Sequence, residues 1–289
     1  MAASSVPKFT LTPTKPIPTL LRRRSHLPCK AISTTSTSTT SDSYWSSTTA
    51  DIESHLDLTL PLRHPLLVHH PMRHLSLHSP PRTLAPALCV AACELVCGAP
   101  RERALDAACA LHLMHAASNA HERLPTIALP RDDDDEGGVV RHAFGPNIEL
   151  LTPDGILPLG YEMVARSAAA AEDPKRTLRV VLEMARAMGS EGYASAQYAE
   201  FHAEGSERFV AERKYGGLYA CGAACGAVMG GAEEEVVERL RRFGLYVGML
   251  RHHGGLFLEG DEDLKSLALM ELEMFESDKV EILSSLVYV

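Results

Sequence analysis

The sequence lacks the features that several common classes of protein require. No run of about 18 apolar residues occurs, so no segment is suited to cross a membrane as a helix. Aromatic residues make up only 6% of the 289 residues, and the net charge is −9. A general nucleic-acid binder would need a basic face and stacking aromatic side chains, so this composition disfavours that class. P-loop, G-x-G-x-x-G, G-x-S-x-G and H-E-x-x-H motifs are also absent.

Alternating runs of Val, Ile and Thr are missing as well, which leaves little from which a sheet could be built. Apolar residues instead recur at helical spacing, and Gly or Pro residues mark helix ends. The pattern predicts an all-α bundle of roughly eight to ten helices. The expected helices cover residues 51–60, 86–96, 102–121, 157–171, 174–188, 204–229, 233–250, 264–275 and 278–287.

The first fifty residues contain almost no acidic residues. They hold one acid, Asp42, against six Lys or Arg residues, and twenty-one of them are Ser or Thr. Such a segment is typical of an organelle transit peptide, here most like a chloroplast one, with a disordered tail as the alternative. We therefore assign residues 1–50 to a chloroplast transit peptide and disordered linker, and residues 51–289 to one helical domain. We expect Ser33–Thr49 not to fold, and cleavage between residues 30 and 50.

Two polar clusters could be taken for metal sites. The acidic run at 132–136 offers carboxylates that suit Mg²⁺, but Pro130 precedes it and Gly137-Gly138 follows it, which favours a solvated loop. Six histidines crowd a Pro-rich region without regular ligand spacing, which favours a surface cluster. These histidines are His55, His64, His69, His70, His74 and His78.

The cysteines show a regular pattern. Seven are present, and no secretory signal precedes them, so we expect reduced thiols. Cys89 and Cys93 form one C-x-x-x-C motif, and Cys221 and Cys225 form a second. On a helix this spacing places the Cβ atoms about 5–6 Å apart, whereas a disulfide needs about 3.8 Å. Spacing alone favours small buried residues, with a structural zinc site as the alternative.

A resemblance to a known family accounts for these motifs. The segment Leu88–Val96 (L-C-V-A-A-C-E-L-V) closely resembles plant trans-prenyl diphosphate synthases of the geranylgeranyl diphosphate synthase family. The similarity covers about residues 51–260. Further matching segments are Pro61–Arg63, Ala107–Ala110, Met114-His115, Leu124-Pro125, Phe144-Gly145, Leu150–Ala165, Lys214, Gly230-Gly231 and Glu233–Phe243. The resemblance implies an isoprenoid-synthase-type helical bundle.

The departures from the family pattern concern the substrate motifs. At the first aspartate-rich motif, D-D-x-x-x-x-D, this chain has Glu122, Arg123 and Ala128. The second motif, D-D-x-x-D, falls near Arg251–Glu259, where no aspartate occurs. G-G-K-R-x-R-P becomes Pro80–Pro86 and keeps one base. Since the two aspartate motifs supply the Mg²⁺ ligands that clamp the diphosphate leaving group, we expect no catalysis and no bound metal in this chain alone.

The paired C-x-x-x-C motifs resemble those of the small-subunit branch of this family. The resemblance implies that Cys89, Cys93, Cys221 and Cys225 support binding to a catalytically active synthase subunit, which would hold the Mg²⁺. Small neighbours such as Gly222 and Gly226 would let helices approach closely. Whether the cysteines touch the partner or only shape a helix that does is left open.

The sequence therefore predicts a non-catalytic, plastid-targeted small subunit that binds a geranylgeranyl diphosphate synthase. It would alter the partner's activity, its product length or its location, with possible peripheral association to thylakoids. Two alternatives remain: a diverged active synthase that uses the acidic run 132–136 as metal ligands, and a scaffold that recruits a synthase without changing its products.

Overall fold

The computed structural model describes residues 38–78, 83–98, 101–122, 144–202, 206–252, 261–275 and 279–288. Within these ranges all regular structure is helical and no strand occurs, as predicted. The helices, with η marking π-helical segments, are α1 (Ser38–Thr59), α2 (Leu66–Arg73), η1 (His74–His78), α3 (Ala85–Cys97), α4 (Glu102–Glu122), α6 (Pro146–Arg166), α7 (Ala168–Glu172), α8 (Pro174–Met188), α9 (Tyr193–His202), α10 (Glu207–Val210), η2 (Ala211–Gly216), α11 (Gly217–Gly230), α12 (Glu234–His252), α13 (Asp261–Leu272) and α14 (Lys279–Ser285).

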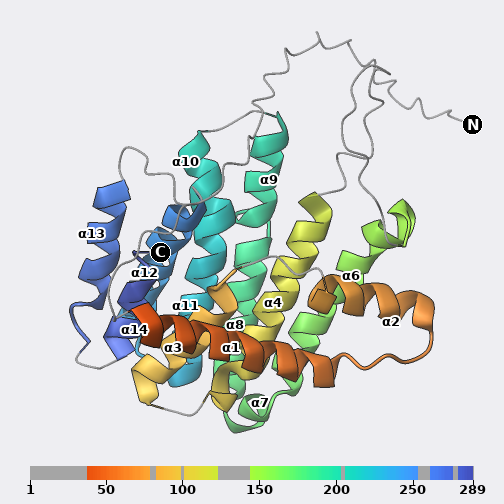
Figure 1. Cartoon of the computed structure of the whole chain (residues 1–289), viewed down its shortest axis with the longest axis horizontal. Helices are drawn as coiled ribbons and strands as arrows, with labels where there is room; N and C mark the ends of the chain where they lie inside the picture. The colour runs from red at the N-terminus through yellow and green to blue at the C-terminus, as the bar shows by residue number, and fades with distance from the viewer. Residues whose placement is uncertain are drawn as a thin grey trace, which may run out of the picture. The chain divides into compact units, whose positions relative to one another are not determined.

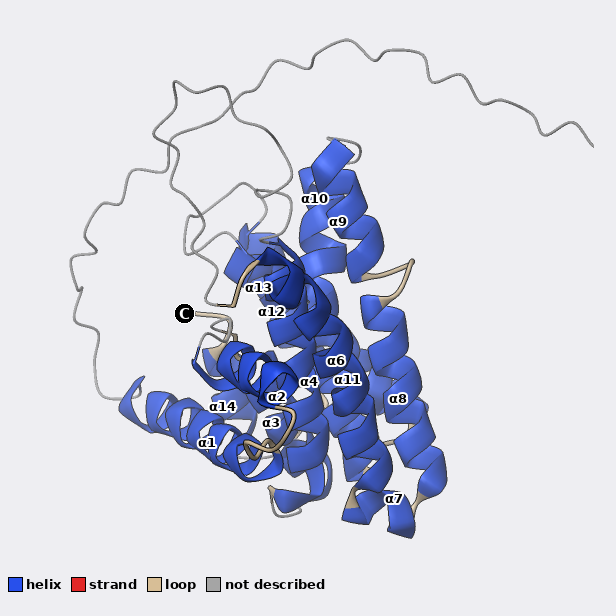
Figure 2. Cartoon of the chain, turned by 90° about the vertical axis from the view of Figure 1, so that its right-hand side faces the viewer, coloured by secondary structure: helices blue, strands red, loops and turns tan. Residues whose placement is uncertain are grey.

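The longer helices form an upright bundle. Figure 1 shows α4, α8, α9, α11 and α12 running roughly side by side, with α1 crossing the lower half of the bundle on the side nearest the viewer. The view in Figure 2 places α8 at the outer edge of the bundle, with α11 on its inner side. This arrangement makes α11 an interior helix and α8 an outer one.

Helices α3 and α11 form the centre because they are apolar on nearly every side, with Glu94 of α3 as a buried carboxylate. Every residue from 85 to 95 and from 218 to 229 is buried. A helix that is apolar all round has no face to offer to water, so it is enclosed by other helices. Both helices end at a glycine with positive φ, Gly98 (59°) and Gly231 (81°), a conformation that glycine adopts without steric cost.

Helix α1 begins earlier than we expected. The expectation that Ser33–Thr49 carries no fixed structure is wrong for residues 38–49, which are helical. Trp45, Ile52 and Leu56 lie on one face of α1 and are buried, with 5%, 2% and 0% of their surface exposed. The Ser/Thr-rich composition concealed this spaced apolar face. The predicted transit peptide otherwise lies outside the described residues.

Three helical segments were missed because of their prolines or their shortness. Pro71 lies inside α2, and Pro153 and Pro158 lie inside α6, which begins at Pro146 and not near 157. The rule that proline marks a helix end fails at Pro71 and Pro153, whereas Pro158 lies inside the helix expected over residues 157–171. Helix α9, of ten residues, was not predicted either. The expected helix 204–229 corresponds to α10, η2 and α11, which follow one another without a gap from Glu207.

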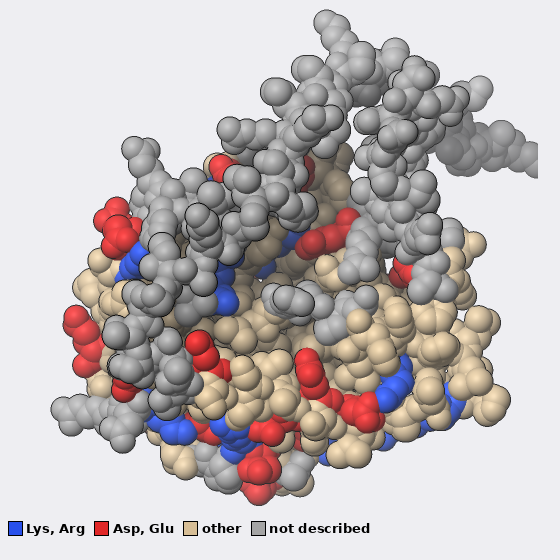
Figure 3. All heavy atoms as spheres, in the orientation of Figure 1, with Lys and Arg blue, Asp and Glu red and all other residues tan. Residues whose placement is uncertain are grey.

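The surface carries ion pairs rather than a field of one sign. On the face drawn in Figure 3, acidic and basic side chains lie next to one another along the lower edge, over α1. Two of the ion pairs that involve α1 join Asp51 to Arg101 at 2.5 Å and Asp57 to Arg73. None of the helices in the described residues is long and apolar enough to cross a membrane.

Candidate functional site

A polar cavity of about 340 Å³ opens between α4, α9, η2, α11 and α12. It lies at the end of α4, where the resemblance places the first substrate motif. Its lining consists of Thr83, His115, Ser118, Asn119, Glu122, Tyr193, Lys214, Tyr215, Leu218, Tyr219, Gly248 and Arg251. Lys214 comes from η2, a π-helical segment of the kind that often marks functional positions.

One of the two cationic side chains that line this cavity, Lys214, is paired with the chain's own carboxylates. The Nζ atom of Lys214 lies 2.6 Å from Glu200 Oε2 and 3.2 Å from Glu122 Oε1. Tyr193 donates its hydroxyl proton to the same Glu122 oxygen at 2.5 Å. Burial lowers the pKa of Lys214, but the Glu200 hydrogen bond and the Glu122 charge outweigh burial, so its pKa is raised. The Lys214 side chain is therefore protonated, and the carboxylates of Glu122 and Glu200 balance its positive charge.

Two further polar groups in this cavity lack partners. His115 Nε2 and Arg251 Nη1 are buried without a hydrogen bond to any described residue. Burial lowers the pKa of His115 to about 3, with a smaller contribution from the neighbouring His112. His115 is therefore neutral at physiological pH and can act as a hydrogen-bond donor or acceptor but not as a cation.

The described residues do not fit a Mg²⁺ site in this cavity. Glu122 is the last residue of α4, and its carboxylate oxygen Oε1 already pairs with the Lys214 ammonium at 3.2 Å. No group of three or more His, Cys, Asp or Glu side chains in the described part of the chain could hold a metal ion. Arg123, Ala128, the acidic run 132–136 and the segment 253–260 lie outside the described residues.

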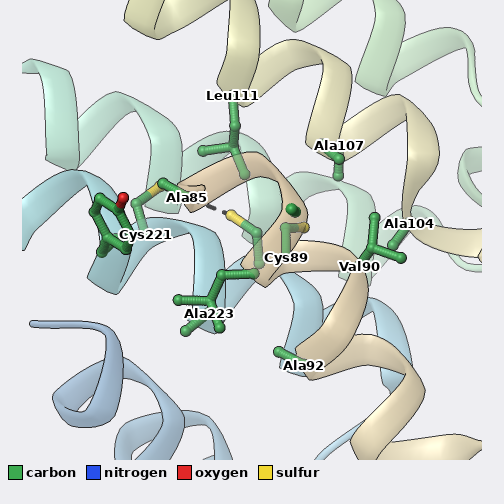
Figure 4. Close-up of a cluster of buried hydrophobic side chains, with 14 of the residues drawn as sticks. Ala85, Cys89, Val90, Ala92, Ala104, Ala107, Leu111, Cys221 and Ala223 are labelled. Atoms are coloured by element: carbon green, nitrogen blue, oxygen red, sulfur yellow. Dashed lines mark hydrogen bonds between the residues drawn. The ribbon is translucent and has the colours of Figure 1, made fainter. Parts of the chain in front are cut away.

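The four motif cysteines lie together inside the protein. Cys89, Cys93, Cys221 and Cys225 are at most 2% exposed. Figure 4 shows Cys89 of α3 and Cys221 of α11 within one cluster of small side chains. The Sγ atoms of Cys221 and Cys225 are 3.8 Å apart, and all six cysteines in the described residues are free thiols. In this chain the motif cysteines belong to the core and not to the surface.

Glycines bring the two cysteine helices into backbone contact. A Cβ atom on Gly222 would collide with the carbonyl oxygen of Ala85, and one on Gly226 with that of Cys89. A Cβ on Gly230 would lie 2.9 Å from the Val96 Cβ. The small residues therefore do permit a close helix approach, but between α3 and α11 of the same chain.

Burial keeps the thiols of Cys89 and Cys93 protonated. Burial raises the pKa of Cys89 well above its usual value, with added repulsion from Cys93 and Cys221. Burial also raises the pKa of Cys93 to about 12. Since the thiolate is the form that reacts and binds metals, these residues act as small apolar packing groups. This agrees with the interpretation that their spacing alone favoured.

Sequence reasoning missed most of the cavity. Tyr193 and Glu200 belong to α9, which was not predicted. His115, Lys214 and Arg251 were noted only as parts of the matching or departing segments. The resemblance was the only signal in the sequence, because the contacts of this cavity join residues that are far apart in the chain, such as Glu122 and Lys214.

Comparison with known proteins identifies the family. The chain is 42% identical over 265 residues to the chloroplastic small subunit 2 of a heterodimeric geranylgeranyl pyrophosphate synthase from Cannabis sativa, spanning 85% of this chain and 90% of that protein. Its structure matches the geranyl diphosphate synthase small subunit from Antirrhinum majus, with TM-score 0.76, 44% identity, and coverage of 87% of this chain and 100% of that one. This chain belongs to the family of plant heterodimeric geranyl and geranylgeranyl diphosphate synthase small subunits.

The family assignment confirms the predicted isoprenoid-synthase-type bundle. A more distant relative is the chloroplastic large subunit 1 of the heterodimeric geranylgeranyl pyrophosphate synthase from Arabidopsis thaliana. It is 34% identical over 206 residues, which cover 68% of this chain and 54% of that protein. The relatives from Cannabis sativa and Arabidopsis thaliana are both named chloroplastic, which confirms the predicted chloroplast localisation. No protein-family profile matches the chain.

Proposed function

We propose that this chain is a non-catalytic regulatory subunit of a heteromeric prenyl diphosphate synthase. It binds an active plastid geranylgeranyl diphosphate synthase and changes that partner's activity, its balance of geranyl and geranylgeranyl diphosphate, or its location, including peripheral association with thylakoids. The names of its relatives support the pairing with a large subunit. The Mg²⁺ needed for ionisation would be held by the partner.

The pairing of Lys214 carries the non-catalytic part of the proposal. A diphosphate entering this cavity would need cations and bridging Mg²⁺. Here the ammonium is only 4% exposed and is held by Glu122 and Glu200, so an anionic substrate would compete with two carboxylates already in place. Arg123 and Ala128, which stand at positions of the family's first aspartate-rich motif, also support a non-catalytic role. The chain would therefore leave the chemistry to its partner.

The motif cysteines support partner binding from inside the protein in this proposal. They are buried between α3 and α11, so their effect on a partner would pass through helix packing. This corresponds to the second possibility left open by the sequence, in which the cysteines shape a helix that makes the contact.

A product assay tests the proposed function. The purified chain is incubated with Mg²⁺, isopentenyl diphosphate and an allylic diphosphate, alone and mixed with the Arabidopsis thaliana large subunit. We expect no product from the chain alone, co-elution with the large subunit, and a changed rate or product ratio in the mixture. Mg²⁺-dependent turnover by the chain alone would instead establish a diverged synthase. Co-elution with unchanged products and rate would identify a recruiting scaffold.

A further inference from the structure

The polar cavity between α4, α11 and α12 contains hydrogen-bonding groups that the chain itself does not satisfy. His115 of α4 is only 7% exposed, and its Nε2 atom is buried without a hydrogen bond to any described residue. The Nη1 atom of Arg251, near the end of α12, is in the same situation. Both residues line the cavity. Because a buried polar atom without a partner is unfavourable, these atoms favour a ligand that brings hydrogen-bond acceptors.

Tyr219 of α11 adds a third donor to the same cavity. It is 7% exposed and lies in the cavity wall. Its hydroxyl oxygen accepts a hydrogen bond from the backbone N–H of Leu84 at 3.0 Å. A hydroxyl group that accepts one bond keeps its own hydrogen for donation. Helices α4, α11 and α12 therefore each supply one donor to this cavity.

The charges of the cavity restrict the ligand to a small anion. Lys214 is already balanced by Glu122 and Glu200, whereas Arg251 Nη1 has no carboxylate partner among the described residues. A guanidinium group matches the oxygen geometry of phosphate. The two nearby carboxylates would repel an anion that carries several charges. The cavity volume of about 340 Å³ is also at the small end for ligand sites.

We propose that this cavity binds a single phosphate group, without a metal ion, through Arg251, His115 and Tyr219. The phosphate is either the free ion or the end of a small phosphomonoester, and its oxygens accept the three hydrogen bonds. This inference goes beyond the proposed function, because it concerns a ligand of this chain alone. It also differs from the diphosphates that the active partner would convert, which need Mg²⁺.

Calorimetric titration tests the metal-free binding. The purified chain is titrated with inorganic phosphate in Tris chloride buffer that contains EDTA. We expect saturable binding whose affinity changes by less than about twofold when Mg²⁺ replaces EDTA, since no metal takes part. Inorganic diphosphate should bind at least about tenfold more weakly than phosphate, because Glu122 and Glu200 repel the extra charge. Absence of saturable binding, or binding that requires Mg²⁺, would overturn the proposal.

Arg251→Gln tests the charged donor with a matched control. The substitution removes a charge-assisted hydrogen bond and should weaken phosphate binding at least about tenfold. Arg239→Gln is the same change on the same helix, at a residue that pairs with Glu271 and does not line the cavity. Arg239→Gln should bind phosphate as the unchanged chain does. Equal affinities of the two variants would place the phosphate elsewhere.

Two substitutions of His115 test the neutral donor. His115→Leu removes the donor and should weaken phosphate binding about fivefold or more. His115→Gln keeps an N–H group and should retain the affinity within about threefold. A residue that only fills space would not distinguish the two side chains in this order. Unchanged affinity in His115→Leu would therefore overturn the three-donor site.

Glu122→Gln should strengthen phosphate binding, which separates the charge argument from damage to the fold. The substitution removes a repelling carboxylate and one of the two partners of Lys214, so we expect about threefold tighter binding. Weaker binding would contradict the role assigned to the charges. Circular dichroism establishes that each variant is folded before it is titrated.

A second ligand identifies the source of the phosphate group. Tighter binding of glycerol phosphate than of inorganic phosphate would identify a phosphomonoester site, and the reverse order a site for the free ion. Both results support the proposal, whereas binding of neither would overturn it. Because these titrations use the chain without a partner, their failure leaves the proposed function intact. Failure to pair with the large subunit would likewise leave the phosphate site standing.

Discussion

At the scale of single residues, Glu183 illustrates how charge holds α8 in place. Its side chain is 2% exposed and lies between Arg179, at 2.7 Å, and Arg241, at 2.6 Å. Burial alone would raise the pKa of Glu183, but the hydrogen bonds from Arg241 and Arg179 outweigh burial, so its pKa is lowered. Removing one member of an enclosed pair leaves the other charges unsatisfied.

This carboxylate gives a pH-dependent prediction. The folded pKa lies below the unfolded value of about 4.3, so its stabilisation is present above that pH and is lost as pH falls through the folded pKa. Glu183→Gln should lower the free energy of unfolding by about 3 kcal/mol at pH 7 and reduce the loss of stability on acidification below about pH 5. Urea unfolding at a series of values between about pH 3 and about pH 7 measures both effects.

Glu234→Gln is the matched control for this prediction. Glu234 pairs with the same Arg179 at 2.7 Å, but its side chain is 63% exposed. A surface pair contributes about 1 kcal/mol or less. Equal losses in the free energy of unfolding for Glu183→Gln and Glu234→Gln would show that the burial of Glu183 does not strengthen its contribution to stability.

At the scale of elements, the contact of α3 with α11 depends on residues without side chains. Gly226 meets the Cys89 carbonyl, whereas a Cβ on Gly217 would find only the Glu212 oxygen at 3.7 Å, an ordinary distance. Gly226→Ala should therefore destabilise the protein by about 2 kcal/mol through overpacking. Gly217→Ala should leave the stability unchanged or slightly higher, since Ala favours helix. Thermal unfolding compares the two, and equal melting temperatures would contradict the close contact.

The same elements show what the sequence could and could not predict. The small residues of α3 and α11 predicted two helices that pack closely against a neighbour. They did not predict that α3 and α11 pack against each other. Pro71 and Pro153 concealed α2 and the first half of α6, because local rules treat proline as a helix breaker, whereas tertiary packing can retain a proline inside a helix. The cavity around Lys214 unites α4, α9 and η2 through contacts that local periodicity does not encode.

At the scale of the whole molecule, the two ends of the described chain meet at one buried carboxylate. Glu94 of α3 accepts hydrogen bonds from Tyr44 of α1 at 2.8 Å, from Arg101 at 3.3 Å and from Lys279 of α14 at 2.6 Å. Trp45 adds a hydrogen bond to Ser285 at 3.0 Å. Helix α1 is thus tied to the body of the protein through residues that lie before position 51.

This attachment predicts where the chain can be shortened. A chain beginning at residue 51 loses Trp45 and Tyr44 and should be less stable than one beginning at residue 38 by at least about 3 kcal/mol, the cost of removing a buried aromatic side chain. Urea unfolding of the two chains provides the measurement. Equal midpoints would mean that residues 38–50 contribute nothing to the fold and would restore the boundary that we first expected at residue 50.

Because the motif cysteines are buried, the rate at which a reagent modifies them reports how often helices α3 and α11 separate. Among the cysteines in the described residues, Cys97 is exposed and the other five are buried. A thiol reagent should therefore modify Cys97 at once, and should reach the buried thiols of α3 and α11 only during excursions that part these helices. A bound large subunit that favours the closed form would slow that second phase by a factor set by its concentration over its dissociation constant. Alkylation kinetics followed by mass spectrometry could thus measure, without any substitution, how much binding of the large subunit reduces the opening of α3 and α11.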